Sequence, residues 1–374
     1  MAEPDVDALV EGINHWVEVE TNTPDATDLD RLLGIVAGEA SGFGAGIKRF
    51  PGREGYGGHL LVRSPWGGLD EPYILTLSHL DTVHPKGTLA TALPIRRDGD
   101  RLYGPGVCDM KAGAYIALDA MRRIAEERKA PSLPVWHLFT SDEEVGSPTS
   151  QALIEELGGR AKYCIVTEPA RNGGHIVTAR KGVARFQLAV EGRPSHAGAR
   201  HQDGRSAIRE LAHQILTLEA MTDYERGITV NVGVISGGTG SNVIAQHARA
   251  EIDLRVPTAQ AGQEMVEKIM NLKPQTDGCT VTVTGGMNRP PFEQSDASKR
   301  LFDHAAGLAQ EIGFELIGEH TGGGSDGNFI ADKLATIDGM GADGNGAHTL
   351  EEHIFISSLV PRMTLIKRLY ETLE

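Results

Sequence analysis

Apolar runs and helical patterns alternate along the chain up to about residue 170. Four short runs have the length and composition of buried strands, and they cover residues 59–63, 73–77, 133–140 and 163–167. Apolar positions at helical spacing precede or separate them, over residues 5–20, 27–40 and about 111–128. Strands that alternate with helices are typical of an α/β fold, so we predict a mixed, mostly parallel sheet flanked by helices.

A different pattern begins near residue 183. Apolar and polar residues alternate over 184–190, 228–234 and 248–256, which is the period of half-exposed strands. Two helical patterns lie between these segments, and a last strand follows them; these elements cover 206–221, 258–272 and 280–284. The resulting order, β-α-β-β-α-β, is that of a ferredoxin-like α+β unit.

These two patterns predict two domains. We place an inserted domain at 179–288 and a discontinuous first domain at 1–178 and 289–374, which ends in a helix over 359–373. A chain of 374 residues also exceeds what one hydrophobic core comfortably organises. Gly285 and Gly286 would lie near the return hinge between the domains.

The composition limits the classes of binding partner and the cellular compartment that we expect. A formal net charge of −15 argues against nucleic acid or an anionic membrane as a partner, because both require a basic surface. No apolar run approaches the ~20 residues of a membrane span. The acidic start Met1–Asp5 is unlike a signal peptide, and three scattered cysteines suit a reduced compartment. We therefore expect a cytoplasmic protein, with a removed presequence as the alternative.

Ionisable residues follow three of the predicted buried strands. His79 follows the strand at 73–77, Glu143 and Glu144 follow the strand at 133–140, and Glu168 follows the strand at 163–167. In open α/β sheets, sites form beyond the carboxyl ends of the strands. Charged residues often follow strands, but three repeats of the pattern favour a site. The pair Glu143–Glu144 taken alone remains more typical of a solvated loop.

Two further residues extend this candidate site. Asp109 lies between a glycine-rich loop and a predicted helix start, and His348 lies in the glycine-flanked segment Gly346–Ala347–His348. With His79, Glu144 and Glu168 they offer two imidazoles and three carboxylates, a ligand set that suits Zn²⁺ and, less specifically, Mn²⁺ or Co²⁺. Five ligands serve two metals if one carboxylate bridges, and Asp109 is the natural bridge. The alternative is that His79 caps a strand and Asp109 caps a helix.

Seven short motifs give the chain a resemblance to a known family. They are SHLDTV, GPGVCDMKAG, SDEEVGS, TEP, PSHAG, GGGSDGN and GAH, in this order. The chain resembles the dizinc aminoacylase and carboxypeptidase family over nearly its whole length. That family includes glutamate carboxypeptidases, acetylornithine deacetylases and succinyl-diaminopimelate desuccinylases. The motifs are most similar to the bacterial glutamate carboxypeptidase branch.

The resemblance implies a site with two Zn²⁺ ions per chain. One ion would be held by His79, Asp109 and Glu168, and the other by Asp109, Glu144 and His348. Co²⁺ or Mn²⁺ would be the alternative metals.

The resemblance also implies catalytic roles. Asp81 would orient His79, and Glu143 would act as general base and then as proton donor to the leaving amine. His196, in PSHAG, would support the scissile carbonyl or its oxyanion, from the same subunit or from the partner. The inserted domain would form a homodimer contact and act as a lid.

Substrate-binding residues are implied as well. Asn242, Arg255 and Arg289 match positions that bind the substrate carboxylate or carbonyl, and an arginine fork is the expected partner of a free carboxylate. Without the resemblance, Arg255 would be a solvated charge on an alternating strand. Arg180 or Lys181 would be the candidate to read a side-chain carboxylate of the substrate.

The function predicted from these features is hydrolysis of an amide bond. The substrate would be an N-acyl amino acid or a C-terminal residue with a free carboxylate, with glutamate as the leading choice. An N-acyl amino acid deacylase or deacetylase and a dipeptidase are alternatives in the same family. The alternative from another class is a metal- or amino-acid-binding module without catalysis, against which the intact Glu143 argues.

Overall fold

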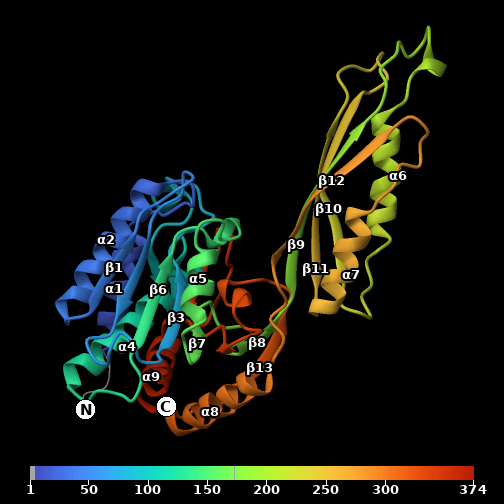
Figure 1. Cartoon of the computed structure of the whole chain (residues 1–374). Helices are drawn as coiled ribbons and strands as arrows, with labels where there is room; N and C mark the ends of the chain where they lie inside the picture. Colours follow the sequence, from blue (N-terminus) through green and yellow to red (C-terminus); the bar gives the residue numbers. More distant parts are fainter. Residues whose placement is uncertain (1–4, 172) are drawn as a thin grey trace. The chain divides into compact units, whose positions relative to one another are not determined.

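The chain folds into two compact units in a computed structural model that describes residues 5–171 and 173–374 (Figure 1). The first unit contains the chain up to Ala179 together with Gln294–Thr321 and Ser325–Glu374. The second unit contains Arg180–Glu293 and Gly322–Gly324.

A six-stranded mixed sheet is the centre of the first unit. Its order is β1 (Gly46–Phe50), β2 (His59–Arg63), β6 (Val135–Thr140), β3 (Ile74–His79), β7 (Tyr163–Val166) and β14 (Ala335–Ile337). β6, β3, β7 and β14 are parallel neighbours, whereas β2 runs antiparallel to both β1 and β6. The predicted α/β class with a mixed, mostly parallel sheet is confirmed.

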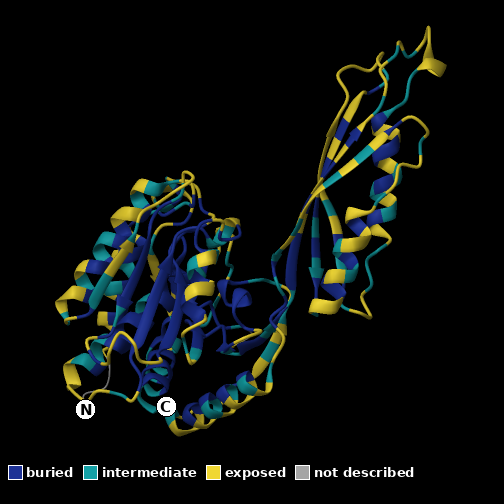
Figure 2. Ribbon diagram, viewed as in Figure 1, coloured by how far each residue is buried: buried dark blue, intermediate teal, exposed yellow. Residues whose placement is uncertain are grey.

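Alternate residues of these strands enter two different cores. Leu60, Ile74 and Ile165 belong to the larger core, which also receives the apolar faces of five helices. These helices are α1 (Val6–Val17), α2 (Ala26–Gly42), α4 (Ala112–Glu127), α8 (Asp296–Ile312) and α9 (Ile356–Thr372). Leu75 and Leu77 enter the other core, against α5 (Gln151–Gly158) and the turn at Asp326–Phe329. The sheet is therefore covered on both faces, and its central strands are buried (Figure 2).

Short elements outside the main sheet escaped prediction. One small sheet joins β15 (Gly344–Asn345), β16 (His353–Phe355), β5 (Arg101–Tyr103) and β4 (Arg96–Asp98), and a second pairs β13 (Gly318–Thr321) with β8 (Ile176–Arg180). Helix α3 (Thr88–Thr91) is equally short. Segments of two to five residues are too short to display a hydrophobic period.

The second unit is a four-stranded antiparallel sheet with two helices. Its elements are β9 (Gly182–Glu191), α6 (Ala207–Glu219), β10 (Thr229–Gly237), β11 (His247–Val256), α7 (Ala259–Met270) and β12 (Thr280–Arg289). The strand order is β10-β11-β9-β12, and α6 and α7 cover one face (Figure 1). This is the ferredoxin-like arrangement that the sequence predicted.

Two boundaries differ from the prediction in ways that matter for the argument. β3 continues to His79, so this imidazole is the last residue of the strand. β12 continues to Arg289, which places Gly285 and Gly286 inside a strand and not at a hinge. Gly285 has φ of +118°, and a Cβ there would collide with the backbone of Arg185, so the glycine permits close pairing with β9.

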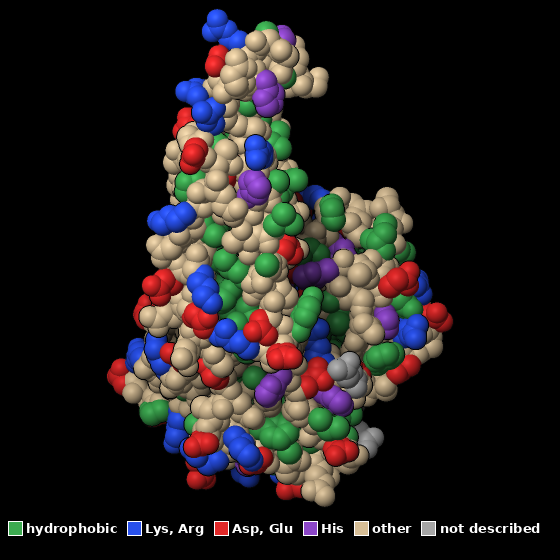
Figure 3. Space-filling view, turned by 90° about the vertical axis from the view of Figure 1, so that its right-hand side faces the viewer, with side chains coloured by type: hydrophobic (Ala, Val, Ile, Leu, Met, Phe, Trp, Pro, Cys, Tyr) green, Lys and Arg blue, Asp and Glu red, His purple; other side chains and the backbone are tan. Residues whose placement is uncertain are grey.

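The surface carries charges of both signs. On the face shown in Figure 3, acidic and basic side chains are interspersed, and that view displays no continuous basic surface. Among the described residues, no helix combines the length and apolarity needed to cross a membrane.

Candidate metal centre

Three neighbouring parallel strands bring ionisable side chains to one edge of the main sheet. His79 ends β3, the turn Glu143–Val145 follows β6, and Glu168 lies two residues beyond β7. Because β6, β3 and β7 are adjacent and parallel, their carboxyl ends meet at the same edge. The structure thus brings together the residues that follow the three predicted strands.

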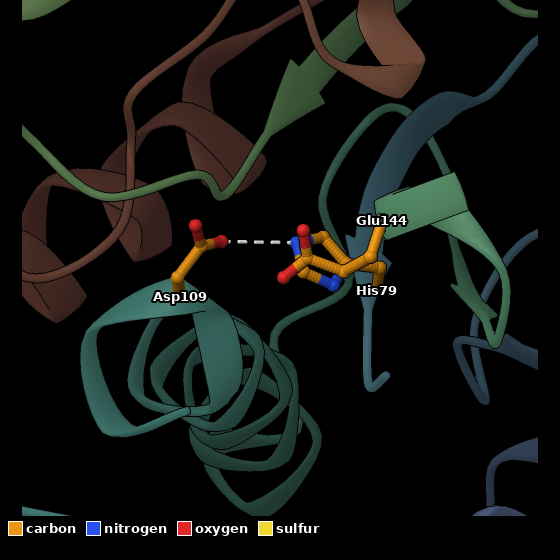
Figure 4. Close-up of side chains that lie close together, drawn as sticks. All are labelled: His79, Asp109 and Glu144. Carbon is orange, nitrogen blue, oxygen red and sulfur yellow. Dashed lines mark hydrogen bonds and ion pairs between the residues drawn. The ribbon is translucent and has the colours of Figure 1, made fainter. Parts of the chain in front are cut away.

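Asp109 reaches this edge from the start of α4. It lies at a non-helical kink within the segment Val107–Lys111. This segment follows Gly106, whose φ of +71° favours glycine. A Cβ on Gly106 would also collide with Thr82. Asp109 Oδ1 lies 3.0 Å from His79 Nε2, and the two side chains point toward each other beside Glu144 (Figure 4).

His348 joins the cluster from the segment between β15 and β16. Its Nε2 lies 3.2 Å from Asp109 Oδ2 and 3.2 Å from Glu144 Oε2. One oxygen of Asp109 therefore faces His79 and the other faces His348. Glu168 Oε1 lies 3.7 Å from His79 Nε2. The contacts divide the five side chains into two trios that share Asp109.

These separations suit atoms that share a cation. Two ligand atoms of one tetrahedral ion, each at about 2.0–2.1 Å, lie roughly 3.3 Å apart. The carboxylate–imidazole separations within the two trios are 3.0–3.7 Å. In addition, potential ligand atoms of His79, Asp109 and Glu144 all lie within 4.8 Å of one another, as do those of His79, Glu143 and Glu168.

A buried carboxylate oxygen tests whether a cation fits. Glu144 Oε1 is buried and has no hydrogen-bond partner among the described residues. A buried acceptor without a hydrogen-bond partner destabilises the folded state unless a positive group faces it. Burial also raises the pKa of Glu144, against the opposing effect of its contact with His348. The residues present therefore fit a metal.

Electrostatic contacts shift the pKa values of the clustered side chains. Hydrogen bonds to Asp109 and Glu144 raise the pKa of His348 to about 10. Burial alone would lower the pKa of His79, but its contacts with Asp109 and Asp81 outweigh burial and raise that pKa well above its usual value. Burial acts to raise the pKa of Asp109, and the two imidazoles reverse this and lower it. The carboxylates thus favour positive charge at this site, which a bound cation would supply.

The buried Asp81 holds the backbone at Glu143 and Glu144 and contacts His79. Its buried carboxylate accepts hydrogen bonds from the backbone N–H groups of Glu143 and Glu144, each at 3.2 Å, and from Thr23 Oγ1 at 2.9 Å. His79 Nδ1 lies 2.9 Å from the backbone oxygen of Asp81 and 3.5 Å from its carboxylate. The backbone oxygen is thus the closer acceptor for His79, which leaves Nε2 of that imidazole directed at Asp109.

Exposure differs across the site. The side chains of His79, Asp81 and Glu168 are at least nine-tenths buried, whereas that of His348 is 53% exposed. The cluster is therefore anchored in the fold on the side of β3 and open to solvent on the side of His348.

His196 and Asn242 lie together in the second unit. The backbone N–H of Ala197 donates to the backbone oxygen of Asn242 at 2.9 Å, and both side chains are exposed. His196 Nδ1 accepts from the N–H groups of Gly198 and Ala199, each at 3.1 Å. These two donors leave Nε2 as the nitrogen that carries the hydrogen in the neutral ring.

The arginines also belong to the second unit and have protein partners. The guanidinium of Arg255 forms a two-pronged pair with Asp253, at 2.6 and 3.0 Å. Arg289 ends β12, is buried, and packs closely against Gly324. Arg180 is buried and donates to the backbone oxygens of Gly323 and Gly324 at 3.3 and 3.5 Å.

Sequence reasoning missed the residues that hold the ligand-bearing loops. Neither His84 nor Glu352 is among the predicted site residues, yet these two buried side chains contact each other, and Glu352 accepts from the backbone N–H of Asp109. The sequence signal that could have pointed to Glu352 is its position four residues after His348. His353 Nδ1 donates to the backbone oxygen of Glu351 in its own loop, and its ring packs against that of Tyr103.

A helix-flanked mixed sheet, an inserted ferredoxin-like unit and paired imidazole–carboxylate trios define an α/β metallohydrolase. Comparison with known proteins agrees, because the model of "Peptidase family M20/M25/M40" matches residues 75–372. The chain belongs to this family. The resemblance predicted from the motifs is confirmed, and the chain is an M20-type metallopeptidase or amidohydrolase. The family implies a dinuclear metal site and a small peptide or amino-acid-derived substrate.

Individual relatives are similar over most of their length. Carboxypeptidase G2 of Pseudomonas sp. (strain RS-16) is 30% identical in an alignment of 370 residues that covers 97% of this chain and 88% of that protein. Succinyl-diaminopimelate desuccinylase of Delftia acidovorans is 29% identical in an alignment of 335 residues that covers 84% of this chain and 85% of that protein. A tripeptidase structure from Staphylococcus aureus has a TM-score of 0.81 at 21% identity, covering 99% of this chain and all of the other, and supports the fold alone.

Proposed function

We propose that the protein is a cocatalytic dizinc hydrolase that releases an amino acid with a free carboxylate from an amide. The observation that carries the proposal is the pair of trios that share Asp109 at the carboxyl edge of the sheet. His79, Asp109 and Glu168 would hold one ion, and Asp109, Glu144 and His348 the other. Zn²⁺ is the metal that this mixed nitrogen and oxygen set suits best, with Co²⁺ or Mn²⁺ as alternatives.

Bound metal would supply Lewis-acid polarisation of the scissile carbonyl and acidify the attacking water. Glu143 would accept the proton of that water and return it to the leaving amine. Two features support this role: an oxygen of Glu143 lies within 4.8 Å of ligand atoms of His79 and Glu168, and its backbone is tied to the buried Asp81. A base fixed in this way pays little reorganisation cost during the reaction.

His196 would donate a hydrogen bond to the developing oxyanion. Support comes from the two backbone N–H groups that occupy its Nδ1, because they leave Nε2 as a donor in the neutral ring. Asn242, which lies beside His196, and Arg255 and Arg289 would bind the substrate carbonyl or carboxylate. A carboxylate at Arg255 would have to compete with Asp253 for the guanidinium.

The substrate class follows from the family together with the arginines. The curated relatives are named a carboxypeptidase and a desuccinylase, and these names describe removal of a C-terminal residue and of a succinyl group. An acyl-glutamate is our leading substrate. Other N-acyl amino acids and dipeptides are the alternatives within the same chemistry. Arg180 or Lys181 would read a second carboxylate on the substrate.

A homodimer through the second unit completes the proposal. β10 is an edge strand of that unit, and its Val234 and Ile235 are 54% and 61% exposed. Exposed apolar residues on the adjacent helix α6, Ile208, Ala212 and Leu216, recur every four residues along one stripe. An unpaired edge beside an exposed apolar stripe favours pairing with a second copy. A cytoplasmic location is consistent with three buried, free cysteines.

An amino-acid-release assay tests the function. Zinc-loaded protein would be given acyl-glutamates, including folate-type ones, other N-acyl amino acids and simple dipeptides, each with and without chelator. We expect chelator-sensitive release of glutamate. Release confined to other amino acids would retain the mechanism and refute the glutamate specificity. Absence of release from every substrate, with two ions bound per chain, would favour the binding-module alternative.

A further inference from the structure

We propose that Glu352 is a positioning residue that fixes the backbone of Asp109 and thereby sets the affinity of both metal positions. The inference rests on the dinuclear centre of the proposed function. Glu352 is not a metal ligand in that proposal. It is fully buried one residue before β16 and four residues after His348.

Both oxygens of Glu352 are fully engaged. Oε1 accepts from the backbone N–H groups of Cys108 at 2.8 Å and of Asp109 at 3.0 Å. Oε2 accepts from the N–H of Gly106 at 3.0 Å and lies 2.6 Å from Nε2 of the buried His84. One carboxylate therefore binds the whole loop that delivers Asp109.

A carboxylate suits these four contacts because it offers about four lone-pair positions as acceptors. Three of the partners are backbone N–H groups, which can only donate. A glutamine at position 352 would have the same shape, but its NH₂ group would face one or two donors. Glu352→Gln is therefore a near-isosteric change that breaks the arrangement.

The same carboxylate ties together three ligand-bearing segments that are distant in sequence. His84 follows His79 by five residues, Asp109 lies in the bound loop, and His348 precedes Glu352 by four residues. The last segment packs tightly: a Cβ on Gly344 would lie 2.9 Å from Cys108 Sγ, and one on Gly346 would lie 3.0 Å from the Glu352 nitrogen. Displacement of Glu352 would therefore move ligands of both trios.

A consequence for metal binding follows from the position of Asp109. Its two oxygens face the two histidines, so a shift of its backbone alters both metal positions at once. Residues that orient ligands typically change metal affinity by about 10- to 100-fold when substituted. We expect Glu352→Gln to raise both dissociation constants by such a factor.

The experiment is a zinc titration of the full-length protein against a chromophoric chelator, with urea unfolding of the metal-free protein in parallel. The matched control is Glu210→Gln in the second unit. Glu210 is also fully buried and accepts from backbone N–H groups, those of Gln275 and Thr276, but it contacts no ligand-bearing segment. We expect Glu210→Gln to lower stability and to leave both dissociation constants within about twofold of the wild type.

The outcomes distinguish failure of the positioning role of Glu352 from failure of the dinuclear centre on which that role rests. If the wild type binds two ions and Glu352→Gln binds both as tightly while losing only stability, the positioning role is wrong. If the wild type itself fails to bind two ions, the dinuclear centre is wrong. Should Glu352→Gln not fold, His84→Ala removes the partner that holds Glu352 Oε2 from outside the loop, so the carboxylate is held less firmly against the loop N–H groups. Both dissociation constants for zinc should then rise, and unchanged affinities in that variant would equally overturn the proposal.

Discussion

Buried acidic side chains around the metal centre are held by backbone N–H groups. Asp81 accepts from the backbone of Glu143 and Glu144, and Glu352 accepts from the loop at Gly106–Asp109. Backbone donors fix a carboxylate without adding a full positive charge beside it. A lysine or arginine in these places would compete electrostatically with a divalent cation. The arrangement keeps the cluster negative where a cation is to bind.

The role of Glu143 is testable by a single change. Glu143→Gln keeps the size of the side chain and removes its ability to accept a proton, so we expect turnover to fall by about 10²- to 10⁴-fold. Metal content, measured by atomic emission, should stay at the wild-type value because we propose Glu143 as the base and not as a ligand. Glu18→Gln, at an exposed position, is the control. Turnover that survives in Glu143→Gln would show that another residue moves the proton.

The buried side chain of His137 should make the free energy of unfolding depend on pH under acidic conditions. It is fully buried in β6, lies 2.7 Å from Ser78 Oγ, and burial lowers its pKa to about 3. In the unfolded chain, the His137 imidazole binds a proton near pH 6.5, whereas in the folded protein it stays neutral down to about pH 3. The free energy of unfolding therefore decreases as the pH falls from about 6.5 toward 3. The loss amounts to about 1.4 kcal/mol per pH unit.

We expect His137→Gln to remove this component. Urea unfolding of the metal-free protein at pH 7.5 and pH 5 would measure it, and the wild type should lose about 2 kcal/mol more than the variant between the two values. Glutamine can still hydrogen-bond to Ser78, so the comparison isolates the titration. His15→Gln, at an exposed position, is the control. Equal losses in wild type and His137→Gln would contradict the assignment.

At the scale of elements, the site depends on which strands are neighbours. β6, β3 and β7 lie side by side, although β6 follows β3 by more than fifty residues in the chain. Their order places His79 between the turn that carries Glu143 and Glu144 and the segment that carries Glu168. Asp109 lies at a non-helical kink just before α4, and His348 lies on a loop with φ of +65°. Strand ends thus supply three of the proposed ligands, and irregular backbone supplies the other two.

The edge strand β10 and helix α6 of the second unit lead to a prediction about the oligomeric state. We expect the wild type to be a dimer and the double variant Leu216→Lys with Ile235→Lys to be a monomer, because two charges would lie in the apolar contact. Sedimentation velocity would measure the mass. Leu69→Lys is the control, since Leu69 is 59% exposed in the first unit. A double variant with the same mass as the wild type would place any dimer contact elsewhere.

At the scale of the whole molecule, the two units have separate cores. The first contains all five proposed metal ligands with Glu143 and Asp81, and the second contains His196, Asn242, Arg255 and Arg289. If the proposed ligands are right, metal binding is a property of the first unit, because all five lie there. Stabilisation by the metal should be confined to that unit in the same way.

Metal removal tests this division. A ligand at 100 times its dissociation constant stabilises the folded state by about 2.7 kcal/mol. We expect chelation to lower the thermal transition and to increase amide exchange in the segments 79–84, 106–111, 143–147 and 346–352 of the first unit. Exchange in β9 and β11 is the internal control and should not change. An equal increase in both units would contradict the assignment of the ligands to one unit.

Local chemistry made much of the molecule predictable from sequence. The length of the apolar runs distinguished the buried central strands from the half-exposed strands of the second unit, because a strand covered on both faces has no polar side. His79, Glu144 and Glu168 could be found because each lies at the end of such a strand or within a few residues of it. The glycine-flanked settings of Asp109 and His348 marked positions where the backbone must turn sharply.

Tertiary structure decided what no local pattern records. Only the sheet order makes β6, β3 and β7 neighbours, and only the fold turns the two oxygens of Asp109 toward two different histidines. The position of Gly285 inside β12 and the contacts of Glu352 are likewise invisible in sequence. The physical reason is that hydrophobic periodicity reports which side of an element is buried. Hydrogen bonds between residues 243 to 246 positions apart depend on where the chain returns, and that is set by packing of the whole unit.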